Sequence, residues 1–177
     1  GLTIILLGSL DKLVVGWVFT LGVLGIYTLI FQFYIACGLA PISLFRFTIS
    51  ESDSSKDVRS ASILGVVVTF TITILGFILL GLLMPVIWPH YAGFVFEAQL
   101  ALVAVLPFVA VNLLSGRFFR QGHIWWVFIA NTIGIAIMIT TIQFLGSFFG
   151  LLGLSLSLIL TQVSILLVLF VIYLIKR

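Results

Sequence analysis

Charged side chains are scarce in this sequence of 177 residues, of which Asp, Glu, Lys and Arg together make up only 7%. A soluble domain of average composition is about 25% charged, so this chain has too few charged groups to cover a water-facing surface. Hydrophobic residues make up 63%, and the mean hydropathy is +1.41. This composition excludes a cytosolic enzyme, a nucleic-acid-binding domain and a disordered tail, and it predicts a protein that lies in a lipid bilayer.

Cysteine is almost absent: Cys37 is the only one, so no internal disulfide can form. The sequence also lacks the HExxH, CxxC, GxSxG and Walker A patterns, which mark common hydrolytic, metal-dependent and nucleotide-binding sites. His90 and His123 fall in predicted loops on opposite sides of the membrane, where they cannot share a metal ion. We therefore expect no enzymatic activity, no cofactor and no metal site.

Long uncharged runs are what the sequence has instead. Four of them contain 33, 37, 19 and 55 residues: Leu13 to Phe45, Ser60 to Phe96, Ala98 to Gly116 and Gln121 to Ile175. A transmembrane helix needs about 20 residues, so several runs hold two crossings. Glycine and proline clusters supply the breaks: Gly22 and Gly25; Pro85, Pro89 and Gly93; Gly146, Gly150 and Gly153. The sequence predicts an all-α membrane protein, a single bundle of six transmembrane helices at about 2–20, 25–45, 61–86, 97–115, 124–145 and 151–175.

The basic residues support this count, because cytoplasmic loops concentrate Lys and Arg. Seven of the eight bases fall in alternate loops and at the C-terminus: Arg46, Lys56, Arg59, Arg117, Arg120, Lys176 and Arg177. This pattern places both termini in the cytoplasm. Aromatic residues agree, with two predicted at the outer interface (Trp88, Tyr91) and three at the inner one (Trp125, Trp126, Tyr173).

The eighth base, Lys12, follows Asp11 halfway along the first apolar segment. A charge at the centre of a membrane helix costs about 2.5–3.5 kcal/mol on insertion scales. Adjacent residues point about 100° apart on a helix and cannot pair as residues four apart do, so each needs a partner from another helix or a water-filled cavity. The pair either joins helices structurally or lies on a substrate route. Pro41 and Pro107 predict kinks in the second and fourth helices. Such a kink either serves as a hinge for movement or only shapes the helix for packing.

Uncharged polar residues are concentrated in the last three predicted helices: Asn112, Asn131, Thr132, Gln143, Thr161 and Gln162. Such residues serve more often as hydrogen-bonding glue between helices than as a transport pathway. Gly134, flanked by Thr132 and Ala136, is the expected point of close helix contact.

Several segments, taken in order, resemble the second half of polysaccharide (O-antigen type) flippases of the multidrug/oligosaccharidyl-lipid/polysaccharide (MOP) superfamily. The segments are Leu10-Asp11-Lys12-Leu-Val-Val-Gly16, Leu24-Gly25-Ile26-Tyr27, Pro85 to Gly93, Ser115-Gly116-Arg117 to Gln121-Gly122, and Gly150-Leu-Leu-Gly153. The resemblance extends over essentially all 177 residues. One departure is Leu154-Ser155-Leu156-Ser157, where the family usually has small residues, and it predicts looser packing at that point.

The resemblance implies one half of a transporter of twelve to fourteen helices, so we expect a fragment that lacks the N-terminal half. The implied activity is transport of a polyprenyl-pyrophosphate glycan, an anionic lipid-linked substrate, across the cell inner (plasma) membrane by alternating access in polysaccharide and lipopolysaccharide synthesis. Lys12 would then meet the pyrophosphate, Asp11 would hold Lys12 or couple to a cation, and Arg46 and Arg117 would gather substrate at the cytoplasmic mouth. The expected partners are the lipid bilayer and either the missing half or a second copy, and no nucleic acid.

Three alternatives remain open from the sequence. The loop arginines fit a role as topology determinants equally well. A drug or cation antiporter of the same superfamily would need more than one intramembrane carboxylate, whereas Asp11 is the only acid deep in a predicted helix. A non-transporting scaffold subunit would use Asp11 and Lys12 only to pair with neighbouring helices.

Overall fold

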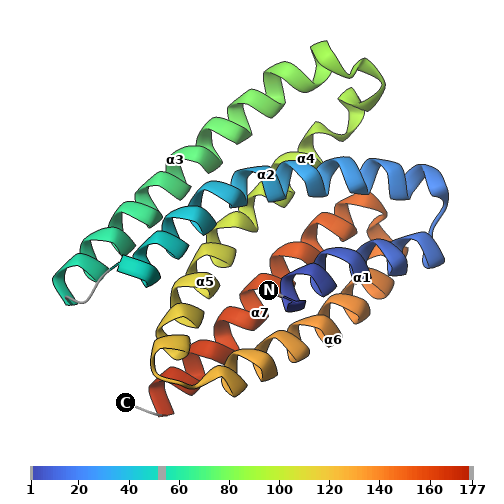
Figure 1. The fold of residues 1–177 in the computed structure, drawn as a ribbon. Coiled ribbons are helices and arrows are strands. Elements are labelled where there is room, and N and C mark those ends of the chain that lie inside the picture. The colour runs from blue at the N-terminus through green and yellow to red at the C-terminus, as the bar shows by residue number, and fades with distance from the viewer. Residues whose placement is uncertain (1, 52–54, 176–177) are drawn as a thin grey trace.

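The computed structural model describes residues 2–51 and 55–175, with side chains at residues 9–39, 42 and 63–175. Every regular element in these ranges is helical. In chain order (Figure 1) they are α1 (Leu2–Val18), α2 (Leu21–Glu51), α3 (Ser55–Ile87), the 3₁₀ helix η1 (Pro89–Phe94), α4 (Val95–Val103), α5 (Val105–Arg120), α6 (Ile124–Phe149) and α7 (Leu151–Ile175). The all-α fold predicted from the sequence is confirmed.

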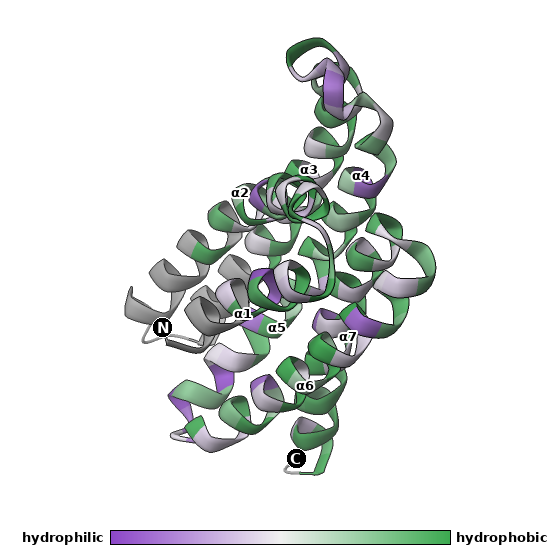
Figure 2. Ribbon diagram, turned by 90° about the vertical axis from the view of Figure 1, so that its right-hand side faces the viewer, coloured by the Kyte–Doolittle hydropathy of each residue, from purple (hydrophilic) through white to green (hydrophobic). Residues whose placement is uncertain are grey.

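Five helical stretches among the described residues are long and apolar enough to cross a membrane: Leu21–Leu39, Ile63–Ile87, Pro89–Arg120, Ile124–Phe149 and Leu151–Ile175. Most of their residues are hydrophobic (Figure 2). The protein is therefore a multi-pass membrane bundle. The sixth predicted crossing is α1, which has 17 residues, or about 25 Å, and contains both Asp11 and Lys12.

The connections between helices gather at two ends of the bundle (Figure 1). The α1–α2 turn, η1 and the α6–α7 turn lie at one end, and the α5–α6 turn and the end of α7 lie at the other. Arg117 and Arg120 occupy the last turn of α5, at the same end as the last described turns of α2 and α7. The helix ends that carry Arg46, Lys56, Arg59, Arg117 and Arg120 thus lie at one end, and Lys176 and Arg177 are outside the described residues.

Two turns differ from the positions that glycines predicted. Gly22 and Gly25 lie inside α2, and the chain turns earlier, at Phe19 and Thr20. Gly146 lies inside α6, which ends at Gly150, where φ is +59° and ψ is −132°. This conformation is essentially restricted to glycine, so Gly150 sets the turn. Gly22, Gly25, Gly146 and Gly153 lie inside helices and mark no break, because glycine is common inside transmembrane helices.

The kink predicted at Pro107 corresponds to a one-residue interruption of the helix. Ala104 lies between α4 and α5 with helical backbone angles (φ −64°, ψ −16°), and Val103 is the last residue of α4. Proline has no N–H to bond the carbonyl group four residues earlier, which here belongs to Val103, and its ring crowds that carbonyl. Pro85 and Pro41 both fall within continuous helices, α3 and α2, and the Pro41 side chain lies outside the described residues.

Glycines bring α6 close to α7 and to the α1–α2 turn. A Cβ atom on Gly134 would collide with the side chain of Ile165 on α7, which confirms the predicted close contact. A Cβ on Gly146 would lie 2.6 Å from Phe19, and one on Gly153 would collide with the Leu145 carbonyl group. The looser packing expected after Gly153 is therefore wrong: Leu154, Ser155 and Ser157 are buried.

Candidate functional site

Asp11 lies in the middle of α1 and is fully buried. The hydroxyl group of Tyr27 on α2 donates a hydrogen bond to Oδ2 of Asp11 over 2.9 Å. The backbone N–H of Lys12 donates to Oδ1 over 2.7 Å. Both carboxylate oxygens therefore have a donor, as a buried carboxylate requires. Asp11 was expected to need a partner from another helix, and that partner is Tyr27.

Lys12 also contacts α2, through Phe31 instead of Tyr27. Its ammonium group lies over the ring of Phe31 on α2, 4.7 Å from the ring centroid, in a cation–π contact. The Lys12 side chain is only half-buried. Because an aromatic face takes none of its hydrogen-bond donors, the ammonium keeps N–H groups for an additional acceptor.

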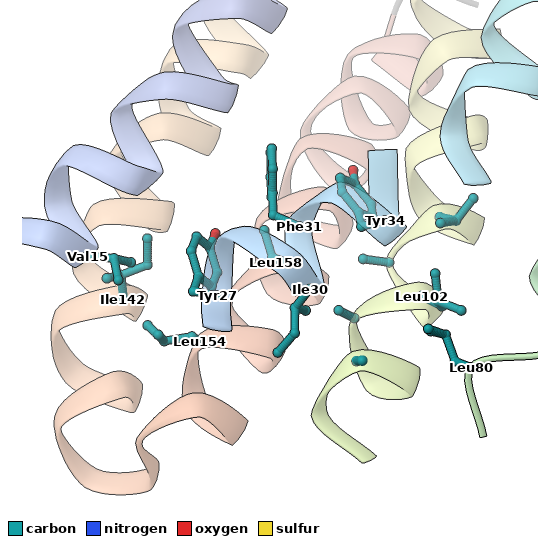
Figure 3. Close-up of a cluster of buried hydrophobic side chains, with 14 of the residues drawn as sticks. Val15, Tyr27, Ile30, Phe31, Tyr34, Leu80, Leu102, Ile142, Leu154 and Leu158 are labelled. Atoms are coloured by element: carbon teal, nitrogen blue, oxygen red, sulfur yellow. The ribbon is translucent and has the colours of Figure 1, made fainter. Parts of the chain in front are cut away.

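Tyr27, Phe31 and Tyr34 form a row on one face of α2, at spacings of four and three residues. Figure 3 shows their side chains leaving the same side of the helix. Ring centroids are 6.0 Å apart for the first pair and 5.6 Å for the second, and Tyr34 also meets Phe108 of α5 edge to face. The Tyr34 hydroxyl group is buried and has no hydrogen-bond partner among the described residues. We name these three residues, with Asp11 and Lys12, the Asp11 centre.

The Asp11 centre lies well inside the bundle. Asp11 is eight residues before Phe19 in the α1–α2 turn, which corresponds to about 12 Å along a helix. A bilayer core is about 30 Å thick, so Asp11 is near mid-depth. Tyr27, Phe31 and Tyr34 belong to a cluster of buried hydrophobic side chains that also includes Val15, Ile30, Ile142, Leu154 and Leu158 (Figure 3). An ionisable group in such surroundings marks a candidate functional site.

The two arginines predicted to lie on the substrate route are not at this level. Arg117 is exposed in the last turn of α5, at the opposite end of the bundle from the α1–α2 turn. The backbone of Arg46 lies in α2, five residues before its end, and its side chain lies outside the described residues. Of the four candidate route residues, the structure brings only Asp11 and Lys12 together.

Four of the polar residues expected to join helices bond to their own helix instead. Asn112, Asn131, Thr132 and Thr161 each donate to the carbonyl group four residues earlier. The glue interpretation is wrong for these four, because a short polar side chain reaches its own backbone first. Gln99 does join two helices: its Nε2 donates to the Phe77 carbonyl oxygen of α3 over 2.9 Å. Sequence reasoning missed Gln99, although an amide in an apolar segment was a signal.

Besides Asp11 in α1, the acid Glu97 lies inside one of the five stretches that are long and apolar enough to cross a membrane. It lies in the first turn of α4, two residues before Gln99, inside the stretch Pro89–Arg120. Its Oε2 atom is buried and has no hydrogen-bond partner among the described residues. The hydrogen bond from Gln99 places it beside Phe77, which is ten residues before the end of α3. Glu97 is two residues from Gln99 and therefore lies beside the apolar part of α3 and not beyond its end.

The described residues contain no group of three or more His, Cys, Asp or Glu side chains able to hold a metal ion. No protein-family model matches the chain, and neither a curated protein nor a solved structure is significantly similar to it. The helices and the buried Asp11 define the class of the protein: it is an all-α, multi-pass membrane protein with a buried ionisable centre.

Proposed function

We propose that this chain is one half of a transporter for lipid-linked oligosaccharides, and that the Asp11 centre binds the pyrophosphate headgroup. In this proposal the chain lies in the inner membrane with its basic end in the cytoplasm. Two bundles rock around a shared polar cavity while the polyprenyl tail stays in lipid. The order of motifs that resembles polysaccharide flippases supports the substrate class.

The observation that carries the proposal is that Asp11 and the Lys12 ammonium group have different partners within the Asp11 centre. The Asp11 carboxylate accepts hydrogen bonds from the Tyr27 hydroxyl group and from the backbone N–H of Lys12, and not from the Lys12 ammonium group. The ammonium rests on Phe31 and is partly accessible. A cation at mid-depth with free donors suits an anionic headgroup, because charge-assisted hydrogen bonds are strong where water is scarce.

Binding of a fluorescent polyprenyl-pyrophosphate oligosaccharide to the chain in liposomes tests the proposal. Losing a hydrogen bond to a charged group costs about 1.5–3 kcal/mol, so Lys12→Ala should weaken binding about 10- to 150-fold. Lys12→Arg should retain much of the affinity. Arg120→Ala removes one positive charge at the exposed end and is the matched control, with little change expected.

An uncharged polyprenol-linked glycan of the same length distinguishes headgroup recognition from general disruption. Its binding should not change in Lys12→Ala, because no phosphate is present to pair with the ammonium. Equal loss for both ligands, or no loss for the pyrophosphate ligand, would assign Lys12 to structure and favour a scaffold subunit.

A cation antiporter is the second candidate function, and Glu97 favours it. Antiport requires a carboxylate that releases and takes up a cation within the membrane. The buried, unpartnered Oε2 of Glu97 supplies such a group in addition to Asp11. In liposomes with a pH gradient, proton-coupled cation exchange that Glu97→Gln abolishes would support this candidate over the glycan transporter.

A further inference from the structure

Two hydrogen-bond donors of the Asp11 centre have no acceptor among the described residues. One is the Lys12 ammonium group, which rests on the face of Phe31. The other is the Tyr34 hydroxyl group, although the Tyr34 side chain is only 5% exposed. A buried hydroxyl group without an acceptor is unfavourable, so most such groups in proteins are paired with protein, water or ligand. The Tyr34 hydroxyl group is therefore a donor that lacks its partner.

Tyr34 differs from the other buried hydroxyl groups that have no partner, which belong to Thr73 and Ser155. A short side chain reaches the carbonyl groups of its own helix by rotation, as Thr69 and Thr71 do. The Tyr34 hydroxyl group is at the far end of a rigid ring and has no such acceptor within reach. Its partner must come from outside its own helix.

The two donors are neighbours on one face of α2. Phe31 and Tyr34 are three residues apart, or about 4.5 Å along the helix axis, and their ring centroids are 5.6 Å apart. The Lys12 ammonium group lies 4.7 Å from the Phe31 centroid. Figure 3 shows the Phe31 and Tyr34 rings extending to the same side of α2. One ligand with two adjacent acceptor groups can therefore reach both donors.

This end of the aromatic row suits an anion. Tyr34 is seven residues, or about 10 Å along the helix axis, beyond Tyr27, whose hydroxyl group is already bonded to Asp11. A ligand beside Phe31 and Tyr34 is thus separated from the negative charge of Asp11. An ammonium group only donates hydrogen bonds, so the ligand must supply acceptors. A pyrophosphate carries two adjacent phosphate groups, one for each donor, whereas a monophosphate carries one.

We propose that Tyr34 gives the site its preference for a lipid-linked pyrophosphate over a lipid-linked monophosphate. The Lys12 ammonium group pairs with one phosphate group, and the Tyr34 hydroxyl group donates to the other. A monophosphate takes the ammonium group and leaves the hydroxyl group unpaired, so it gains nothing from Tyr34. This inference rests on the proposed function, which itself requires only that Lys12 binds the headgroup.

Phe108 on α5 covers Tyr34. The two rings meet edge to face with centroids 5.8 Å apart, and a Cβ atom on Gly38 would lie 3.2 Å from the Phe108 ring. Phe108 directly follows Pro107 and is close to the interruption at Ala104. Because Pro107 has no N–H to donate, α5 bends here without losing that hydrogen bond. In the proposed cycle, movement of α5 at this point carries Phe108 away and gives the headgroup access to the hydroxyl group.

Binding of two fluorescent polyprenyl glycans to the chain in liposomes tests the inference. The ligands differ only in a pyrophosphate or a monophosphate linkage. The wild type should bind the pyrophosphate ligand at least about tenfold more tightly, since a hydrogen bond to a charged group adds to its affinity. Tyr34→Phe should weaken binding of the pyrophosphate ligand about 10- to 150-fold and change that of the monophosphate ligand little. Lys12→Ala should weaken binding of both.

Two controls separate recognition from folding. Tyr34→Phe keeps the ring that contacts Phe31 and Phe108, so its unfolding, measured on the same preparations, should match that of the wild type. Tyr173→Phe removes the same atom two residues before the end of α7 and should leave binding of both ligands unchanged.

The outcomes distinguish the role of Tyr34 from the proposed function. Equal affinity of the wild type for the two ligands would overturn the role of Tyr34, even if Tyr34→Phe fails to fold. So would a preference that Tyr34→Phe leaves unchanged, or an equal loss of both ligands in that variant. In each case, weaker binding of both ligands by Lys12→Ala would leave the proposed function standing. Failure of the wild type to bind either ligand would overturn both proposals.

Discussion

Replacing Tyr27 by phenylalanine removes one oxygen atom, the hydroxyl group that donates to Oδ2 of Asp11. Both residues are fully buried, so no water replaces the lost donor without a change in packing. A hydrogen bond to a charged acceptor contributes about 1.5–3 kcal/mol. We expect Tyr27→Phe to lower the free energy of unfolding by this amount, which is about 10- to 150-fold in the folding equilibrium.

A double-mutant cycle isolates this hydrogen bond from other effects. The four proteins are the wild type, Tyr27→Phe, Asp11→Ala and the double variant, each unfolded reversibly in mixed micelles. The coupling energy should fall between about 1 and 3 kcal/mol, because the two groups touch directly. A coupling energy near zero would refute the assignment of Tyr27 as the partner of Asp11.

Tyr34→Phe is the matched control. It removes the same atom seven residues further along α2, from a hydroxyl group that is buried without a partner. Removing an unsatisfied polar group does not lose a hydrogen bond, so stability should stay unchanged or increase slightly. The two variants together separate loss of the specific bond from general disturbance of the aromatic row.

Three other predictions concern packing, the α6–α7 turn and topology. Gly134→Leu should destabilise the bundle by about 1–3 kcal/mol or more through collision with Ile165, and Ile165→Ala should restore part of the loss in the same unfolding assay. Gly150→Ala should cost about 1–3 kcal/mol in that assay because the backbone at Gly150 has φ +59° and ψ −132°; an unchanged stability would mean that the turn is formed differently. In the Cys37→Ser background, an impermeant thiol reagent added to intact cells should label His90→Cys and leave Lys56→Cys unlabelled, and the reverse pattern would invert the topology.

The helical architecture was predictable from the sequence because membrane spans leave a strong signal in composition. The last helix was predicted at 151–175 and is found at Leu151–Ile175. The turns at Thr20 and Gly150 were misplaced by a few residues, since glycine both interrupts and continues membrane helices. Only the backbone angles at Gly150 show which of the nearby glycines makes the turn.

The candidate site was predictable only in part. A carboxylate at Asp11 in an apolar segment indicated that a partner was needed, but Tyr27 is 16 residues away and became its partner through the packing of α1 on α2. Asn112 and Asn131 were expected to reach other helices, yet each bonds to its own backbone. Rotamer choices of this kind depend on the surrounding packing, which a single sequence does not reveal.

Photocross-linking with a lipid-linked pyrophosphate oligosaccharide tests the central claim most directly. The probe carries a diazirine on the sugar next to the pyrophosphate, and mass spectrometry locates the adducts on the chain in liposomes. We predict adducts on the peptides that contain Lys12 and Phe31 to Tyr34, and their loss in Lys12→Ala. Adducts confined to the exposed apolar faces of α3 and α7, and unchanged in Lys12→Ala, would contradict a headgroup site at the Asp11 centre.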